Sequence, residues 1–257
     1  MELVDVWRYP VKSLQGERLD AVEVERDGLL GDRRWGIRDR GTGRILTARR
    51  RPELLAAAAS YDGDLPVITL PDGSRTAGPG RATDDRLSEW LGIPVTLTAS
   101  VDSVPGRAEF FADATDDTSE AIEFTMPESR YVDAAPLLVL TTSSLRAGRA
   151  LHPDGVWDPR RFRPNLLIDL DGDQWVEDGW LGRTLQVGSV TVRPTEQCIR
   201  CTMVTRAQPG LEHDVEVFRT LARHHGARVG VWTDVLTTGT VAVGDPAAVT
   251  APGPTVS

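Results

Sequence analysis

Glycine and proline are frequent along the 257-residue chain, with 24 and 17 copies respectively. Both residues favour turns and are poorly tolerated inside helices, so their frequency indicates many short elements rather than a helix bundle. Between the turns, segments such as ELVDVW (2–7) and AVEVERDG (21–28) alternate between apolar and polar residues. This period of two is typical of half-buried strands. We therefore expect a mainly β fold with some helix, of the α+β class.

The same patterns locate the other elements. Further strands are expected at 33–48, 65–77, 163–170, 184–194, 229–236 and 239–249. The first two of these segments each contain a hairpin turn, DRGTGR in 33–48 and PDGS in 65–77. Helices are expected at 50–60, at 83–92 with Thr83 or Asp84 as the cap and Gly92 as the stop, and at 214–225. Residues 136–151 predict a buried strand that leads directly into a helix, with Thr142 to Ser144 at the junction.

A polar segment divides the chain. Residues 101–130 are interrupted by Pro105 and Gly106 and contain the sequence DATDDTSEA. We interpret this segment as the seam between two parts, because polar, turn-rich stretches commonly separate domains. The predicted boundaries are 1–115 and 116–250, followed by a flexible tail at 251–257.

The charge of the chain restricts its partners. The formal net charge is −9, which disfavours binding to a nucleic acid polymer or to an anionic membrane. Arginines nevertheless gather at 31–40 and 47–51, a pattern that favours binding of a small anion. No run approaches the roughly 18 apolar residues of a membrane span, and the N-terminus lacks the pattern of a signal peptide. We expect a cytoplasmic protein without a membrane partner.

Cys198 and Cys201 are the only cysteines, in the sequence TEQCIRCTMV. Two cysteines do not make a disulfide framework, and the histidine spacings do not match a zinc finger. A thioredoxin-like pair would need a helix after the motif, where the pattern shows none. Two packed structural thiols remain possible, as does one thiolate beside Arg200 that acts as a metal ligand or nucleophile. The cysteines alone leave this choice open.

The surrounding sequence resembles the MOSC-domain proteins, in particular the group of the mitochondrial amidoxime-reducing component and its bacterial homologues. Seven blocks follow the order of that family: YPVKSLQGE, GLLGDRRWGIRD, LTARRRPEL, DAAPLLVLTTSSL, RFRPNLLID, the cysteine block and GTVAVGDPA. The resemblance implies two β-barrel-like parts, an N-terminal MOSC β-barrel domain and a C-terminal MOSC domain. It also implies a molybdenum cofactor of the molybdopterin type held between them.

The resemblance assigns roles to individual residues. It makes Cys201 the molybdenum ligand and catalytic residue, and Cys198 a packing or tuning residue. It places Lys12, Ser13 and Arg33 at the cofactor phosphate. The other expected cofactor-binding residues are Arg49, Ser143, Ser144, Arg163, Asn165, Arg200 and Trp232. An arginine beside an aspartate is otherwise often a surface ion pair, a helix-opening serine a simple cap, and a strand tryptophan a core residue.

The activity implied by the resemblance is reduction of N-oxygenated compounds such as hydroxylamines, amidoximes and N-hydroxylated bases. No cysteines remain for an iron–sulfur cluster, so the electrons are expected from a separate protein: a ferredoxin, a flavodoxin, or a cytochrome b5-type protein with its reductase. Two alternatives use the same residues. One is a MOSC sulfur carrier with a persulfide on Cys201, and the other is a protein that binds the molybdenum cofactor without catalysis.

Overall fold

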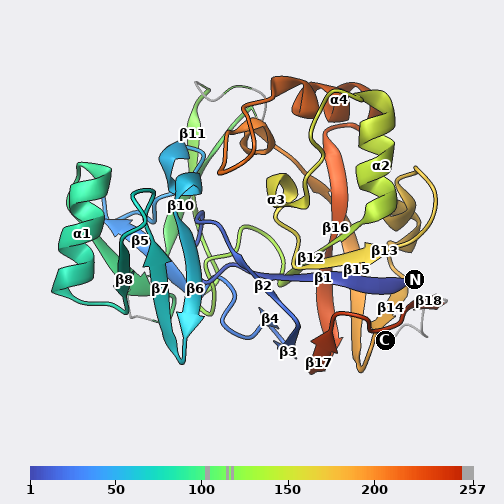
Figure 1. Ribbon diagram of the computed structural model, residues 1–257, viewed down its shortest axis with the longest axis horizontal. Coiled ribbons are helices and arrows are strands. Elements are labelled where there is room, and N and C mark those ends of the chain that lie inside the picture. The colour runs from blue at the N-terminus through green and yellow to red at the C-terminus, as the bar shows by residue number, and fades with distance from the viewer. Residues whose placement is uncertain (102–104, 114–115, 117–118, 251–257) are drawn as a thin grey trace.

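The computed structural model describes residues 1–101, 105–113, 116 and 119–250. Its largest sheet has eight strands and runs through the right half of Figure 1. In spatial order, these strands are β18 (Ala247–Thr250), β14 (Thr184–Val187), β15 (Val190–Ile199), β16 (Arg228–Thr237), β12 (Leu137–Thr141), β13 (Leu166–Asp169), β1 (Glu2–Arg8) and β2 (Glu17–Leu19). All neighbours are antiparallel except β12 and β13.

The remaining strands form four small sheets. They are β17 (Gly239–Ala242) with β3 (Ala21–Glu25) and β4 (Gly28–Leu29); β5 (Trp35–Asp39) with β9 (Val95–Ala99); β6 (Ala58–Asp62) with β7 (Leu65–Thr69) and β8 (Arg75–Ala77); and β10 (Arg107–Phe111) with β11 (Ala121–Thr125). The predicted α+β, mainly β class is confirmed. Within the described part of the chain, no sheet closes into a continuous barrel, since every strand order has two ends.

Two strand pairings join the beginning of the chain to its C-terminal half. β1 pairs with β13, and β3 pairs with β17. β1 and β2 therefore extend a sheet formed mainly by residues beyond 136, and β3 and β4 take β17 as their third strand. These pairings place the YPVKS and GDRRW segments against the C-terminal part. The boundary at residues 115 and 116 stays a prediction.

Helices cover the two ends of the molecule. α1 (Arg81–Leu91) lies at one end of the long axis, whereas α2 (Thr142–Leu151) and α4 (Val215–His225) lie at the other (Figure 1). The short helices are α3 (Pro159–Phe162) and the 3-10 turns η1 (Pro52–Ala56), η2 (Val176–Trp180) and η3 (Thr202–Thr205). None of the helices in the described residues is both long and apolar enough to span a lipid bilayer.

Three large apolar cores and a smaller one around Tyr131 hold these layers together. The first fills the interior of the large sheet and the β17–β3–β4 sheet, with fully buried Leu3, Val139 and Val231. The second lies under α1 and includes Leu54 and Leu87. The third packs α4 and the segment around α3 against the other face of β12, β13 and β16. The site described below lies where segments from these cores meet.

Several elements differ from the sequence-based expectation. The helix expected at 50–60 ends at residue 56 as η1, and the following residues form β6. The expected hairpin partner of β5 forms an isolated bridge between Arg38 and Ile45, while β5 pairs with β9. The residues of β6 pair with the next strand, β7, as a hairpin. At β5, tertiary pairing overrides the local pattern, because the strand gains β9 as a long-range partner.

The expected cap of α1 was also wrong. The helix begins at Arg81 with Gly80 at the N-cap, and it ends as predicted at Gly92 in the left-handed conformation. Asp84 accepts hydrogen bonds from the Leu97 N–H and the Thr96 hydroxyl, and so links the helix to β9. The segment at 101–130, interpreted as a polar seam, contains the β10–β11 hairpin. The predicted tail at 251–257 lies outside the described residues.

Candidate functional site

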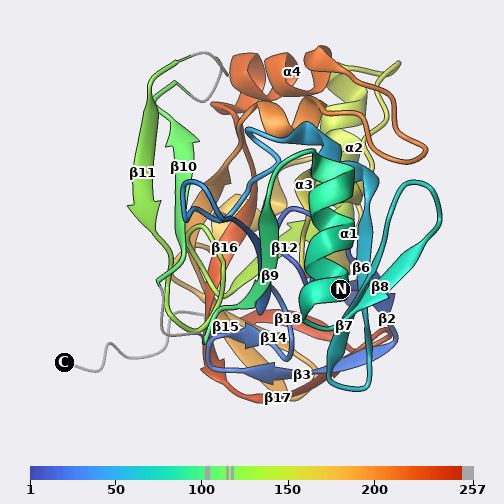
Figure 2. The ribbon, with the colours of Figure 1, turned by 90° about the vertical axis from the view of Figure 1, so that its left-hand side faces the viewer.

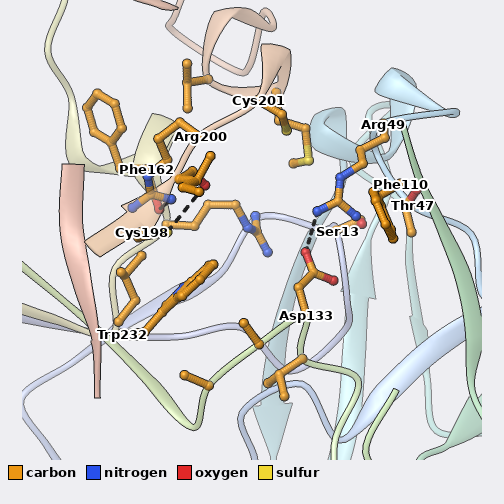
Figure 3. A pocket seen from close by; sticks show the side chains of 18 of the residues that line it. Ser13, Thr47, Arg49, Phe110, Asp133, Phe162, Cys198, Arg200, Cys201 and Trp232 are labelled. Atoms are coloured by element: carbon orange, nitrogen blue, oxygen red, sulfur yellow. Dashed lines mark hydrogen bonds and ion pairs between the residues drawn. The ribbon is translucent and has the colours of Figure 1, made fainter. Parts of the chain in front are cut away.

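A pocket of about 680 Å³ opens between the two halves of the chain (Figure 3). Its walls come from loops near residues 12, 33 and 133, from the segment that follows α3, and from the end of β15. All of the predicted site residues except Ser143 and Ser144 line it, namely Lys12, Ser13, Arg33, Arg49, Arg163, Asn165, Arg200, Cys201 and Trp232. Residues far apart in the sequence are thus brought to one cavity.

The charge of this lining is strongly positive. Asp133 is the single acidic residue among the lining residues that the structure describes. The cationic lining residues are Lys12, Arg33, Arg49, Arg161, Arg163 and Arg200. In a chain with a net charge of −9, such a concentration of cations in one cavity favours an anionic ligand.

Asp133 bridges two of these cations. Its Oδ1 lies 2.6 Å from Lys12 Nζ and its Oδ2 lies 2.6 Å from Arg49 Nη2. Burial would raise the pKa of Asp133, but the charges and hydrogen bonds of Lys12 and Arg49 outweigh burial and hold the pKa well below its usual range. Lys12, which also donates to the Tyr131 carbonyl, has a pKa lowered by burial. Asp133 therefore stays ionised and neutralises part of the cationic wall.

Two arginines stack on one buried aromatic ring. The guanidinium carbons of Arg33 and Arg163 lie 4.8 and 4.2 Å from the centre of the Tyr9 ring. Burial raises the pKa of Tyr9 above its ordinary value, so the phenol stays neutral and donates to the Pro164 carbonyl. Cation–π contact fixes both guanidinium planes without using their N–H donors.

Most donors of these two arginines remain available. Arg33 Nη1 donates to the Asp32 carboxylate and, at 3.5 Å, to the Asn165 side-chain oxygen. Arg163 Nη1 donates to the Leu14 carbonyl. The hydrogen bonds of both side chains among the described residues use only that atom. Burial lowers the pKa of Arg163 to about 10, which keeps it charged at neutral pH. Arg33 and Arg163 can therefore bind an anion with their remaining N–H groups.

Backbone strain is concentrated in the same place. Ser13, Arg33 and Arg163 adopt φ values of 71°, 50° and 55°. They are three of the four residues other than glycine with positive φ in the described ranges, the fourth being Ala227. Such conformations cost free energy and cluster at functional sites. The Ser13 hydroxyl accepts the Ala48 N–H at 3.0 Å, so its proton can be donated to a ligand.

The two cysteines have different environments. Cys198 is buried within β15, and burial raises the pKa of its thiol to about 11. Cys201 follows the strand, immediately precedes η3 and is partly exposed. Arg49 lies between Cys201 and Asp133 (Figure 3). Burial would lower the pKa of Arg49, but the Asp133 carboxylate and the Cys201 sulfur hold it above its ordinary value. Cys201 is thus the accessible thiol.

Arg200 and Asn165 line the pocket, and both also form hydrogen bonds with the backbone. Arg200 donates to the Phe162 carbonyl at 2.9 Å and to the Val229 carbonyl through two nitrogens at 3.0 and 2.9 Å. The Asn165 amide accepts the Leu138 N–H and donates to a backbone carbonyl of β1. Both side chains mainly fix the backbone on which the pocket is built. Trp232, on β16, faces the same wall (Figure 3).

Ser143 and Ser144 lie away from the pocket. Both side chains are buried. The Ser143 hydroxyl donates to the Gln174 carbonyl at 2.7 Å, and the Ser144 hydroxyl donates to the Glu177 carboxylate at 2.7 Å. The helix α2 begins where the sequence predicts, but its buried face turns these hydroxyls toward η2. The structure therefore does not bring these two residues to the predicted cofactor site.

The sequence-based reasoning missed several lining residues. Asp133 and Thr47 belong to the blocks DAAPLL and LTARRR, but nothing local marks them as pocket residues. Phe110 and Phe124 come from the segment interpreted as a polar seam, where two alternating apolar residues in each strand were the available signal.

Comparison with known proteins agrees with this architecture. The model of the MOSC N-terminal beta barrel domain matches residues 1–114, and that of the MOSC domain matches residues 127–248. The chain is 24% identical to mitochondrial amidoxime reducing component 2 of Bos taurus over 225 residues and 26% identical to mitochondrial amidoxime-reducing component 1 of Homo sapiens over 231 residues. These matches cover 78% and 79% of this chain and 65% of each relative, so the chain spans less than two thirds of their length.

A second kind of relative carries a different name. A molybdenum cofactor sulfurase of Oryza sativa subsp. japonica is 24% identical over 235 residues, which is 78% of this chain and 28% of that protein. Identities near 25% make all three relatives distant. Because the two domain models follow one another and together span nearly the whole described chain, the chain belongs to the MOSC family, with a MOSC N-terminal beta barrel domain followed by a MOSC domain.

Proposed function

We propose that this protein is a molybdenum-cofactor-dependent reductase of N-oxygenated compounds. One observation carries the proposal: a pocket lined by six cations has one partly exposed thiol in its wall. A cationic wall suits an anionic cofactor, and a thiolate suits a redox-active transition metal. The similarity to amidoxime-reducing components, named for that activity, supports the substrate class.

The residues present fit such a cofactor. Lys12, Ser13 and Arg33 would hold its phosphate, and Arg163 would bind a further polar edge, because each lines the pocket and carries N–H or O–H donors. Cys201 would supply the metal ligand. The described residues contain no group of three or more His, Cys, Asp or Glu side chains able to hold a metal ion. A metal here would therefore be held by Cys201 together with atoms of the cofactor itself.

The overall reaction would convert an N–OH group and two electrons with two protons into N–H and water. When bound, the cofactor supplies the two-electron chemistry and Lewis acidity. The chain would bind and orient the cofactor. Asp133 is not the proton donor, since its pKa lies far below neutral pH. No histidine occurs among the described lining residues, so solvent water is the expected proton source.

The electrons would come from a separate protein, because the two cysteines of the chain cannot hold an iron–sulfur cluster. A ferredoxin, a flavodoxin, or a cytochrome b5-type protein with its reductase would serve. The activity can be reconstituted with an artificial donor such as reduced viologen, so that the assay does not depend on knowing the natural partner.

The first test is the molybdenum and pterin content per chain, measured on protein made in a host with an intact molybdenum-cofactor pathway. The parent and a Cys198→Ser variant are expected to hold about one molybdenum per chain. A Cys201→Ser variant is expected to lose the metal and the reduction of N-hydroxylated substrates. Full metal content together with full turnover in Cys201→Ser would refute the proposal.

The sulfurase relative favours one alternative. Cys201 could carry a persulfide and pass sulfur to a cofactor, since it is accessible and has Arg49 beside it to stabilise a charged sulfur. Mass spectrometry would then show one extra sulfur atom on Cys201 in protein that holds no molybdenum. Stoichiometric cofactor with neither reduction nor added sulfur would favour a non-catalytic carrier of the cofactor.

A further inference from the structure

The β10–β11 hairpin has one apolar and one charged face. β10 and β11 pair with each other and with no other strand of the described chain. In their register, Ala108 lies opposite Phe124, and Phe110 lies opposite Ile122. Because side chains alternate along a strand, these four residues share one face. Figure 2 shows the hairpin standing at one edge of the molecule.

The charged face fixes the orientation of the hairpin. Arg44 contacts Glu109 at 3.0 Å and Glu123 at 2.6 Å, while Arg50 reaches Glu109 at 3.3 Å and Arg107 reaches Glu123 at 3.1 Å. Single exposed ion pairs contribute little, but this network is shared by two glutamates on neighbouring strands. Together with the hydrogen bond from the Ile45 N–H to the Arg107 carbonyl, it fixes the hairpin against the segment of residues 44–50.

The apolar face extends from a small core into the pocket. At its inner end, Ala108 is fully buried against Ile45, Met126 and Tyr131, with Phe124 packed beside them. At its outer end, Phe110 is 39% exposed, although its ring lies 5.8 Å from that of Phe124. Phe110, Ala112 and Phe124 line the same cavity as Cys201. Phe110 lies next to Arg49 and Thr47 on the wall (Figure 3).

The pocket therefore has two chemically different walls. Arg33 and Arg163 lie on the side of Tyr9, where they suit an anion, whereas Arg49 lies beside Phe110 and is paired with Asp133. The hairpin wall has no charged side chain on its pocket face and presents an incompletely covered aromatic ring. Aromatic pairs at such distances are favourable in tilted or offset geometry, so a planar ring can add to the Phe110–Phe124 pair. Ligand pockets are lined predominantly by apolar and aromatic side chains, with a few polar groups that fix the orientation of the ligand.

We propose that the apolar face of the β10–β11 hairpin binds the uncharged aromatic body of the substrate while its N-oxygenated end lies toward Cys201. This inference rests on the proposed function and specifies its substrate class. The chain would prefer aryl over small aliphatic N-hydroxylated compounds, and Phe110 would be a specificity-determining residue.

The test compares two amidoximes that share the reacting group and differ in the body, benzamidoxime and acetamidoxime. The protein is used with its cofactor bound and a viologen donor. Phe110→Ala is expected to raise the KM for benzamidoxime about tenfold with kcat unchanged, as expected for loss of a contact made equally in ground and transition states. The KM for acetamidoxime is expected to stay within twofold.

Ile122→Ala is the matched control. Ile122 lies opposite Phe110 on the same face and is 40% exposed, but it does not line the pocket. Its loss should leave the ratio of the two substrates unchanged. Phe110→Tyr keeps the ring and should retain the benzamidoxime preference. Direct binding of benzamidoxime, measured by ligand-observed NMR on the same proteins, gives a readout independent of turnover.

The outcomes separate this inference from the proposed function. Reduction of both amidoximes with a ratio unaffected by Phe110→Ala would overturn the hairpin inference alone. Reduction of neither, with benzamidoxime binding weakened tenfold by Phe110→Ala but not by Ile122→Ala, would support the hairpin inference and remove the reductase proposal. If both variants raise the KM for a protein electron donor and not for benzamidoxime, the face binds that protein and the inference is wrong.

Discussion

Replacing Asp133 by asparagine tests the charge balance of the pocket. The carboxylate is held by Lys12 at 2.6 Å and by Arg49 at 2.6 Å, and both cations have most of their side chain buried. Asparagine has almost the same shape but no charge. The substitution therefore leaves two largely buried cations facing each other without a counter-ion, while the packing stays nearly unchanged.

The expected loss can be worked out from these contacts. Two hydrogen bonds between charged groups contribute about 1.5–3 kcal/mol each when they are well buried. Since the side chain of Asp133 is 41% exposed, solvent screening reduces this contribution toward the lower end. We expect Asp133→Asn to lower the free energy of unfolding by about 2–3 kcal/mol at pH 7.

The pH dependence gives this loss a distinct signature. The pKa of Asp133 in the folded protein lies below the ordinary value of 3.8, so the carboxylate stabilises the fold at all pH values above 3.8. The stabilisation is lost as the pH falls below 3.8, by about 1.4 kcal/mol for each pH unit, until the folded pKa is reached. The difference between parent and variant should therefore be constant from pH 5 to 8 and shrink near pH 3.

Urea unfolding followed by circular dichroism at several pH values measures this difference. Asp234→Asn is the control, because its ion pair with Arg193 is about half exposed and 3.3 Å long. That variant should differ from the parent by less than about 0.5 kcal/mol. A loss below that limit in Asp133→Asn, or a loss that does not change down to pH 3, would show that the carboxylate does not balance the two cations.

Three further substitutions test other parts of the structure. Burial raises the pKa of Glu177 in the folded protein, so its ionisation costs stability once the pH exceeds the ordinary value of 4.5. The stability of Glu177→Gln relative to the parent should therefore rise as the pH increases from 4.5 through the folded pKa, and urea titrations that show no rise above pH 4.5 would contradict this. Gly28→Ala places a Cβ 2.5 Å from the Pro136 carbonyl at a φ of +120°, and thermal unfolding should show a loss of about 2–4 kcal/mol, whereas no loss would mean that this backbone approach is loose. Arg200→Lys removes a fork that donates to two backbone carbonyls, which should cost about 1–2 kcal/mol in the same assay and loosen metal retention; unchanged stability would mean that the fork is not structural.

Local sequence patterns located most of the elements correctly. Alternating residues marked β1, β3, β14, β15 and β16, and Gly92 marked the end of α1 through its left-handed conformation. These signals are local, because they depend on side-chain periodicity and on the backbone freedom of single residues. The local pattern was misleading at β6, where it predicted a helix, and at the β10–β11 hairpin, which was interpreted as a polar seam.

The resemblance predicted the pocket better than the local patterns could. It named residues separated by more than 150 positions, such as Lys12 and Arg200, and the structure places them around one cavity. It did not reveal the orientation of each side chain. Ser143 and Ser144 belong to a matching block, yet their hydroxyls bond to the segment around η2 and leave the pocket. A motif specifies residue identity, whereas rotation of a helix about its buried face decides where a hydroxyl points.

The sequence by itself determined a mainly β fold; it also predicted a small anion as the ligand class and, through the family motifs, the thiol Cys201 as the reactive group to examine. Tertiary structure alone decided that Asp133 balances Lys12 across a sequence separation of 121 residues, that Arg33 and Arg163 stack on one ring, and that the β10–β11 hairpin supplies an aromatic wall. The physical reason is the distance along the chain over which each interaction acts. Periodicity and turn preference act within a few residues, whereas charge compensation, stacking and burial depend on which distant segments the fold brings into contact.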